Sequence, residues 1–470
     1  MKPSDRTNLS DAPDWSALIP VLPLAGPRPA ALYGELRRLI ESGVPPGTKL
    51  PPTRELATRL GVSRGAAVAA FEMLLAEGFA EARVGAGTYV AQAVPQMLPI
   101  PAAPTADVVL APALPGGLGI AAPDTRTFQL LRGLLARQLA APARAHFAYG
   151  DPRGNLALRQ EVAAYLRAAR GVRCHAEQIV LTSGSQQALD LVIRAALKPG
   201  DPVWIEDPCY PMARAAFTGA GMQLVGVPVD GEGLDPAAGE ERASEAKAVY
   251  VTPSHQFPLG VTLTMARRLA LIDWARRAGA WIIEDDYDSE FRYAGPPLTA
   301  MQGMDPAGRV IYVGTFSKAL FPGLRMGYVV VPEPLLAAVI DVRNRADRYP
   351  PTLMEQPLAD FLHGGHFSAH LRRARRRARD ARDALLATLS EAGLPVLAPD
   401  QGLHLLLTRP DWADDTVLVR RAHAVGFGPR ALSALHVDAP RRQGLVIGFS
   451  GFPPEELAAA ARRWAAAREG

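Results

Sequence analysis

Apolar residues recur at helical spacing in three short stretches near the N-terminus, and a glycine follows each of them. The stretches lie within residues 32–40, 53–60 and 63–77. Ser63 marks the start of the third predicted helix, because a serine side chain accepts hydrogen bonds from the unpaired amides of a first helical turn. Two short apolar segments, 79–82 and 88–91, then flank a glycine-containing loop and predict a β-hairpin.

The composition changes after the hairpin. Prolines are frequent and charged residues are almost absent between residues 92 and 123. Such a segment disfavours helices and sheets and acts as a semi-rigid spacer. We therefore predict an N-terminal arm over 1–27, a first domain over 28–92, a linker over 93–122 and a second domain over 123–470.

Beyond the linker, short apolar runs alternate with helical patterns. The runs are bounded by turn residues and predict strands at 178–182, 202–205, 248–251, 281–284 and 310–314. Amphipathic segments such as 186–197 and 265–278 lie between some of them. The alternation predicts an α/β fold with a mainly parallel sheet that helices cover.

Composition excludes several classes of protein. A chain with 48% hydrophobic and 21% charged residues is not disordered as a whole. Cys174 and Cys209 are the only cysteines, which excludes a disulfide framework and a four-cysteine zinc site and fits a reducing cytoplasm. We predict neither a metal site nor a membrane span. The net charge of +4 is too small for this length to indicate a nucleic-acid partner by itself.

The first domain has the plan of a winged helix-turn-helix. The link between its second and third helices is short, and in this motif the second helix of the pair enters the major groove of DNA. Arg54 and Arg64 begin these two helices, and guanidinium groups suit phosphate or guanine contacts. Gly85 and Gly87 would let the hairpin tip approach the duplex closely. A helical module that binds protein, with solvated arginines, is the alternative.

Three segments of the second domain each predict part of a cofactor site. Residues 182–186, Thr-Ser-Gly-Ser-Gln, join a strand to a helix whose first amides can hold an anion, although a plain helix cap fits equally well. Residues 284–288, Glu-Asp-Asp-Tyr-Asp, end a strand where α/β sheets bind ligands, and a metal site or a solvated acidic turn is the alternative. Lys318 follows another strand, beside hydroxyl residues and an arginine. A lysine, a carboxylate and a phosphate cup are what pyridoxal phosphate requires.

The first domain closely resembles the GntR-type winged helix. The resemblance rests on LPPTRELA at 50–57, LGVSR at 60–64 and GAGTYV at 85–90. It implies a double-stranded DNA operator as partner, with DNA contacts from Arg54, Ser63, Arg64, Gly85 and Gly87. Residues 65–67 are Gly-Ala-Ala where polar residues are usual, so we expect few direct base contacts.

The second domain resembles fold type I aminotransferases, in the version fused to GntR-type winged helices, the MocR family of regulators. The matching segments are YGDPRG at 149–154, SGSQ at 183–186, EDPCY at 206–210, TPSHQFPLG at 252–260, EDDY at 284–287 and SK at 317–318. The resemblance implies an aspartate aminotransferase-like large and small domain and a homodimer. It also implies pyridoxal 5'-phosphate, bound as a Schiff base to Lys318.

The resemblance assigns further cofactor contacts residue by residue. The implied ring contacts are Asp285 at the pyridine nitrogen, Tyr287 at the ring hydroxyl, Tyr210 over the ring, and His255 or Gln256 near the ring hydroxyl. The implied phosphate contacts are Ser183, Gly184, Ser185, Thr315, Ser317 and Arg325.

Two departures from the family bear on function. Leu259 stands where threonine is usual, and residues 447–451 lack the arginine with which many aminotransferases grip a substrate carboxylate. Arg430 could substitute spatially, although an ordinary surface arginine fits as well. We therefore predict a cytoplasmic, pyridoxal-phosphate-dependent transcriptional regulator that senses an amine, an amino acid or the cofactor itself. An active aminotransferase with an appended regulatory winged helix is the alternative, since the same cofactor residues serve both.

Overall fold

The computed structural model describes residues 18–20, 22, 28–93, 112–122, 124–141, 148–438 and 441–467. The chain forms two compact units, residues 1–110 and 111–470, and each is a separate body. Most of the predicted arm and of the predicted linker lies outside the described residues, so the domain boundaries stay predictions. Within the described ranges, no helix is long and apolar enough to cross a membrane.

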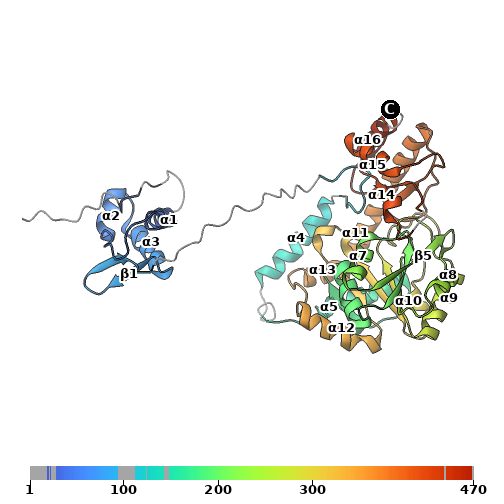
Figure 1. Ribbon diagram of the computed structural model, residues 1–470, viewed down its shortest axis with the longest axis horizontal. Helices are drawn as coiled ribbons and strands as arrows, with labels where there is room; N and C mark the ends of the chain where they lie inside the picture. Colours follow the sequence, from blue (N-terminus) through green and yellow to red (C-terminus); the bar gives the residue numbers. More distant parts are fainter. Residues whose placement is uncertain are drawn as a thin grey trace, which may run out of the picture. The chain divides into compact units, whose positions relative to one another are not determined.

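The first unit packs three helices against a two-stranded hairpin (Figure 1). Its elements are α1 (Arg28–Glu41), α2 (Thr53–Leu60), α3 (Arg64–Ala76), β1 (Ala80–Arg83) and β2 (Gly87–Val90). Apolar side chains of all three helices, Phe71 among them, form one buried cluster. Ser63 caps α3 by accepting a hydrogen bond from the Ala66 amide over 3.1 Å, and Gly61 ends α2 in the left-handed conformation. Both helix boundaries confirm the sequence pattern.

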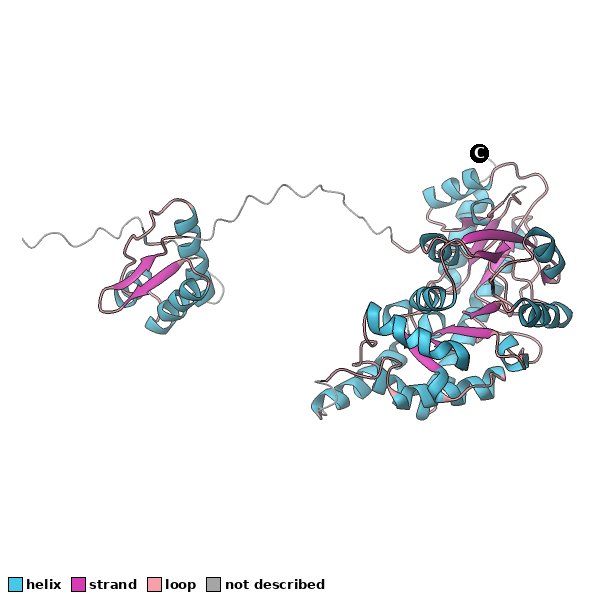
Figure 2. Ribbon diagram, turned by 60° about the horizontal axis from the view of Figure 1, so that its bottom comes forward, coloured by secondary structure: helices cyan, strands magenta, loops and turns pink. Residues whose placement is uncertain are grey.

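The second unit is built on an eight-stranded sheet with helices on both sides (Figure 2). The strand order is β3-β10-β9-β8-β7-β4-β5-β6, and the pairs from β9 to β5 are parallel. The strands are β3 (Ile179–Thr182), β4 (Pro202–Asp207), β5 (Gln223–Asp230), β6 (Gly233–Leu234), β7 (Ala248–Val251), β8 (Trp281–Asp286), β9 (Val310–Thr315) and β10 (Gly327–Val330). The helices around them are α4 (Thr125–Ala140), α5 (Leu156–Arg170), α6 (Ser185–Ala196), α7 (Pro211–Gly219), α8 (Pro236–Arg242), α9 (Met265–Ala278), α10 (Met301–Met304), α11 (Phe316–Ala319), α12 (Glu333–Ala346) and α13 (Glu355–His363).

The predicted strands all form, and the mainly parallel α/β sheet is confirmed. The sequence pattern did not reveal β5, β6 or β10 of this sheet. β10 runs antiparallel between β3 and β9. This strand is short and follows the loop around Arg325, so its apolar run was not separable from the preceding motif by periodicity.

A smaller sheet and three helices gather at one end of the second unit, drawn in orange to red in Figure 1, and we call this part the small domain. Its elements are α14 (His366–Glu391), β11 (His404–Leu407), α15 (Asp415–Ala424), β12 (Arg430–Ala431), β13 (Leu445–Gly448) and α16 (Pro454–Ala467), with strand order β11-β13-β12. Residues 112–122, which we call the strap, pack against it. The Gly448 amide donates to the Gly116 carbonyl over 2.8 Å, and a Cβ on Gly448 would lie 2.1 Å from the Gly117 oxygen. This close backbone approach requires glycine.

Candidate functional site

Parallel pairing brings the carboxyl ends of β4, β7, β8 and β9 to one edge of the large sheet. β8 ends with Asp285 and Asp286, and Tyr287 follows directly. β9 ends at Thr315 and leads into the short helix α11, which carries Lys318. Residues that are far apart in the sequence therefore meet where ligands bind in sheets of this kind.

A cavity of about 650 Å³ opens at this edge. Eight of the predicted cofactor residues line it, namely Ser185, Tyr210, Asp285, Tyr287, Thr315, Ser317, Lys318 and Arg325. The structure thus brings together most of the predicted site, while the individual roles stay predictions. Ser183, Gly184 and His255 are not among the lining residues.

Asp285 has one satisfied and one unsatisfied carboxylate oxygen. The Tyr250 hydroxyl donates to Oδ2 over 2.7 Å, whereas Oδ1 is buried and meets no donor in the described part of the chain. Burial raises the pKa of Asp285 to about 7, and the Tyr250 hydrogen bond only partly offsets that rise. A buried acceptor without a partner is costly. The protonated pyridine nitrogen of the cofactor would supply the missing donor, so this residue fits pyridoxal phosphate.

Lys318 lies in the same cavity and is partly buried. Burial lowers the pKa of its ammonium group, although the carboxylates of Asp288 and Asp285 partly offset the effect. A lowered pKa favours the neutral amine, which is the nucleophilic form. The strap passes directly over this amine, because a Cβ on Gly119 would lie 2.6 Å from Lys318 Nζ.

The part of the cavity around Ser185 and Arg325 has the features of an anion site. Gly184 adopts a φ of +108°, and a Cβ there would lie 3.5 Å from the guanidinium of Arg325. α6 begins at Ser185, so its first amides point toward this end. Thr315 Oγ1 accepts a hydrogen bond from the Ser317 amide over 3.1 Å, which orients both hydroxyls. The amide of Ser183 instead donates to the Gln187 side chain over 2.7 Å.

The two alternatives for the ring hydroxyl, His255 and Gln256, both lie behind the cavity wall. His255 Nδ1 is 2.9 Å from Asp288 Oδ2, and the Tyr287 hydroxyl donates to the His255 carbonyl over 3.0 Å. The Gln256 amide group donates to two backbone carbonyls over 2.8 Å. His255 is therefore placed to position Tyr287 from behind. His255, Asp288 and His404 also form a cluster. Each offers one potential metal-ligand atom, and these three atoms lie within 4.8 Å of one another.

Several lining residues were missed by the sequence analysis. They are Tyr250, Phe257 and His404 on the walls and Leu118 and Gly119 on the strap. Tyr250 alone carried a signal, because it is a polar side chain inside a predicted buried strand. The strap carried none, since its prolines and glycines predicted only a spacer.

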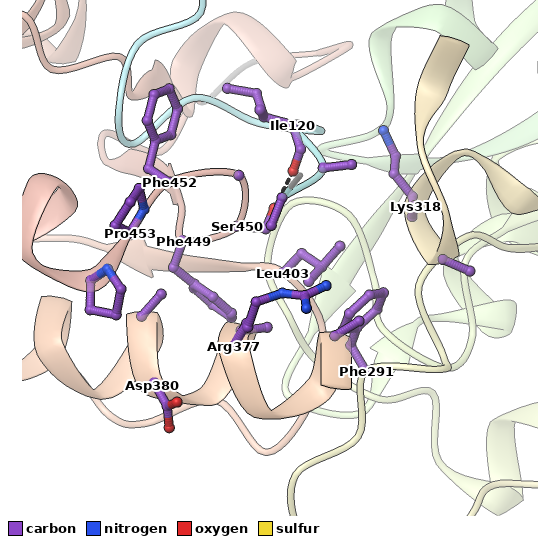
Figure 3. Close-up of a pocket in the computed structure, with 18 of the residues that line it drawn as sticks. Ile120, Phe291, Lys318, Arg377, Asp380, Leu403, Phe449, Ser450, Phe452 and Pro453 are labelled. Carbon is purple, nitrogen blue, oxygen red and sulfur yellow. Dashed lines mark hydrogen bonds between the residues drawn. The ribbon is translucent and has the colours of Figure 1, made fainter. Parts of the chain in front are cut away.

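A second cavity, of about 290 Å³, adjoins the first and shares Lys318 and Leu403 with it (Figure 3). Ser450 Oγ donates to the Ile120 carbonyl over 2.7 Å and fixes the strap at this point. Arg377 also lines this cavity, and its guanidinium pairs with Asp124 over 3.2 Å. The strap is thus held between the small domain and the lysine.

In the first unit, Arg54 and Arg64 are exposed at the starts of α2 and α3. Neither forms an ion pair within the described residues, whereas nearby Arg59 pairs with Glu55 over 2.7 Å. Unpaired guanidinium groups at helix starts are available to phosphates. This placement fits the predicted DNA contacts.

The hairpin tip and the third helix agree with a DNA-facing surface. Gly85 and Gly87 are exposed with φ of +73° and +111°, a conformation that favours glycine. Ala66 and Ala67 are buried in the helical core, so their side chains do not contribute to the exposed surface of α3. Ser63 is exposed, with its hydroxyl engaged as the α3 cap.

Known proteins match both units. Residues 117–422 match the family described as aminotransferase class I and II, and residues 30–90 match the bacterial regulatory proteins of the gntR family. The chain is 37% identical over 450 residues to the probable rhizopine catabolism regulatory protein MocR of Rhizobium meliloti, covering 91% of this chain and 90% of that protein. The chain belongs to the MocR family of regulators.

Two further relatives show what each part of this MocR-family chain is similar to. The HTH-type pyridoxine biosynthesis transcriptional regulator PdxR of Corynebacterium glutamicum is 34% identical and covers 91% of this chain and 93% of its own. The kynurenine aminotransferase of Pyrococcus horikoshii, solved in complex with PMP, superposes with a TM-score of 0.69 at 29% identity. That alignment covers 76% of this chain and 91% of the enzyme.

These matches confirm the predicted fold class, a GntR-type helix-turn-helix followed by a fold type I aminotransferase domain. They favour a DNA-binding transcriptional regulator over a plain aminotransferase. The aminotransferase fold implies dependence on pyridoxal phosphate.

Proposed function

We propose that this MocR-type regulator carries pyridoxal phosphate as a Schiff base on Lys318, senses an amine there, and changes its binding to a DNA operator in response. One observation carries the proposal. The cavity that holds Lys318 is also lined by Leu118 and Gly119 of the strap, which leads toward the linker and the first unit. A ligand at Lys318 therefore has direct access to the chain segment that joins the two units.

The residues of the cavity fit the cofactor in three places. Asp285 Oδ1 would accept the hydrogen bond of the pyridine nitrogen, Tyr210 would cover the ring, and Tyr287 would face the ring hydroxyl. The phosphate contacts that we propose are Ser183, Gly184, Ser185, Thr315, Ser317 and Arg325. When bound, pyridoxal phosphate supplies an aldehyde carbon that condenses reversibly with amines.

Lys318 gives this site its response to amines. With the cofactor bound, an incoming amine would replace the Lys318 amine at the aldehyde carbon. One proton would pass from the incoming amine to lysine, with no net oxidation or reduction. The low pKa that burial gives Lys318 lets it leave as a neutral amine. The released side chain would lie next to Gly119 of the strap, where even an added Cβ would come within 2.6 Å of Lys318 Nζ.

The strap couples that movement to the small domain and the linker. The Gly428 amide donates to the Pro115 carbonyl and the Gly448 amide to the Gly116 carbonyl, each over 2.8 Å. These hydrogen bonds tie the strap to the small domain, so we expect a shift at Gly119 to change the contacts at both points. A ligand that binds two strap positions with different affinity must bias the equilibrium between them.

The DNA contacts that we propose are those of Arg54, Ser63, Arg64, Gly85 and Gly87. A homodimer in the cytoplasm fits this function, because two winged helices bind paired half-sites. Large apolar side chains of the second unit remain exposed in the single chain, among them Phe128 and Tyr149. These would be covered in a dimer.

The decisive experiment measures linkage. A duplex selected from random sequence for tight binding is titrated with apoprotein, with cofactor-loaded protein and with loaded protein plus single amines, by fluorescence anisotropy. We expect at least one amine, or the cofactor itself, to change duplex affinity by about 5- to 150-fold, and the duplex to change the ligand's affinity by the same factor. Borohydride reduction followed by peptide mapping should place the cofactor on Lys318, and Lys318→Ala should carry none.

Two results would contradict the proposal. Covalent cofactor in reduced Lys318→Ala would exclude the lysine assignment. Complete transamination of an amino acid, with no ligand changing duplex affinity, would instead support the runner-up, an active aminotransferase with an appended winged helix. That runner-up rests on the same cavity, since the cofactor residues serve both functions.

A further inference from the structure

We propose that Arg430 on β12 binds an anionic group of the effector, so that the effector is an amine that also carries a carboxylate or another oxyanion. The inference rests on the proposed function, because it names the chemical class that the Lys318 cavity recognises. It gives a role to an arginine whose position in the sequence indicates only a surface residue.

Arg430 reaches the cavity from the small domain. It lines the same cavity as Lys318 and lies directly opposite Val446 of β13 in an antiparallel pair. Side chains of directly opposite residues in such a pair share one face of the sheet. Val446 packs in an apolar cluster with Leu118, Tyr210 and Tyr287, three residues that line the cavity. The face that carries Arg430 is therefore the face toward the cofactor site.

Two arginines of the cavity lack an acidic partner. Neither Arg325 nor Arg430 forms an ion pair with any residue that the structure describes. Arg377 in the adjoining cavity differs, because Asp124 neutralises it over 3.2 Å. Unpaired guanidinium groups that face one cavity indicate anionic ligands. The cofactor phosphate would account for Arg325, and Arg430, which is exposed at the cavity, remains available for an anionic group of the effector.

Arg430 is also close enough to the reactive amine for its charge to be felt there. Burial is the main cause of the lowered pKa of Lys318, and the positive charge of Arg430 lowers it further. The same charge opposes the rise in the pKa of Tyr210, which burial and Asp285 produce. Arg325 has no such effect on Lys318 and lies beside Gly184 instead. Arg430 is thus the cation at the amine end of the cavity, and an amine bound there can present an oxyanion to it.

This position also accounts for a departure in the sequence. β13 and the residues after it, 445–451, contain no arginine, although many aminotransferases grip a substrate carboxylate from near this point. Arg430 supplies a guanidinium from the neighbouring strand, directly across from Val446. Compared with those aminotransferases, the guanidinium comes from the neighbouring strand but lies on the same face of the small sheet.

The test compares amines with and without an anionic group on cofactor-loaded protein. The probes are L-alanine, the unbranched ω-amino acids from glycine to 5-aminovalerate, the ω-aminosulfonates of equal length, and n-alkylamines of equal length. Apparent dissociation constants come from the visible absorption change of the cofactor and, separately, from the change in duplex affinity. We expect the best anion-bearing amine to bind at least about tenfold more tightly than its alkylamine. The carboxylate and sulfonate series identify which oxyanion is preferred.

Variants assign that preference to one residue. Arg430→Gln should reduce the anion preference, measured as the ratio of the two dissociation constants, to nearly none, and Arg430→Lys should keep part of it. Arg420→Gln on α15 is the matched control, because Arg420 is an exposed arginine of the small domain outside the cavity lining. The exchange Arg430→Val with Val446→Arg should restore some preference from the opposite strand, with thermal melting to verify folding.

The inference is overturned if the unmodified protein shows no preference for anion-bearing amines, or if Arg430→Gln retains the full preference. Failure of the proposed function is a different result, in which no amine of either class changes the cofactor spectrum or the duplex affinity of the unmodified protein. The two failures are therefore separable in one set of titrations.

Discussion

The two units present their candidate functional residues in opposite ways. In the first unit, Arg54 and Arg64 project from a small helical core and are exposed to solvent. In the second unit, Asp285 and Lys318 line the cavity at the strand ends. Burial raises the pKa of Asp285 and lowers that of Lys318, so both shifts favour the neutral form. One unit uses full charges on its surface, and the other holds ionisable groups away from water.

This difference determines what each ligand contributes. DNA brings a field of phosphates to charges that are already present, so binding there depends on salt and on the number of cations. The cofactor brings hydrogen-bond donors and a phosphate to groups that lack partners, such as Asp285 Oδ1. Removing a side chain should therefore have a graded effect in the first unit and an effect that depends on protonation in the second.

The largest expected effect tests the exposed charges. Arg64→Ala and Arg54→Ala should each weaken binding to the selected duplex by roughly tenfold or more, because each removes a phosphate or guanine contact. The slope of log affinity against log salt should fall by about one for each phosphate that is no longer neutralised by an arginine. Fluorescence anisotropy at several salt concentrations measures both quantities.

Arg59→Ala is the matched control, since Arg59 lies on the same helix but pairs with Glu55. It should leave duplex affinity and salt slope nearly unchanged, and all three variants should keep the cofactor spectrum. If the Arg54 and Arg64 variants bind the duplex as tightly as the unmodified protein does, the proposal that these arginines face DNA is wrong.

Sequence reasoning succeeded where local pattern decides structure. Helices α2 and α3 follow from apolar spacing and from caps at Gly61 and Ser63. Motifs place Lys318 and Asp285 after buried strands, and the two residues line one cavity because parallel pairing brings such strand ends together. These features need no knowledge of distant contacts.

Sequence reasoning failed where a contact joins distant segments of weak local character. The sequence did not predict that the strap packs on β13, because this contact depends on glycines that allow close backbone approach. Arg430 was left between two interpretations, since only the pairing of β12 with β13 shows which way its face points. The hydrogen bond from Tyr250 to Asp285 likewise depends on the order of strands in the sheet.

A medium effect tests the strap over the enclosed lysine. Gly119→Ala places a Cβ 2.6 Å from Lys318 Nζ at a backbone φ of +76°. We expect cofactor affinity to fall by about 3- to 10-fold, because the lysine must move from its place and a side chain at this φ is strained. Equilibrium titration of apoprotein with pyridoxal phosphate, followed by visible absorption, measures the change.

Gly279→Ala separates the two causes. Gly279 ends α9 at a φ of +65° with no atom within 4 Å of an added Cβ, so it carries the backbone strain without the contact. It should lower the thermal midpoint and leave cofactor affinity unchanged. Equal cofactor affinity in the Gly119 variant and the unmodified protein would show that the strap does not press on the lysine.

The smallest expected effect tests the enclosed carboxylate by its pH dependence. In apoprotein the pKa of Asp285 is raised to about 7 from an ordinary value of 3.8, mainly by burial and further by Asp286 and Asp288, while Tyr250 and Lys318 act against the rise. A carboxyl group whose pKa is raised in the folded state lowers the free energy of unfolding at high pH. The unfolded chain ionises above about pH 4 and the folded chain only above about pH 7, so stability is lost as pH rises through this window and stays lost above it.

Asp285→Asn removes the ionisation and should therefore stabilise apoprotein by several degrees at pH 8, with the gain shrinking as pH falls from 7 toward 4. In cofactor-loaded protein the sign should reverse at pH 8, because the carboxylate then accepts the hydrogen bond of the pyridine nitrogen and asparagine cannot offer the same charge. Thermal melting of both forms between pH 5 and pH 8 measures the two differences. Asp305→Asn is the control, because it changes a carboxylate that caps a surface turn at the start of the segment leading to β9. A gain for Asp285→Asn that is equal at pH 5 and pH 8 would show that this carboxylate is not held neutral by burial, and the contrast between the two units would then lose its clearest example.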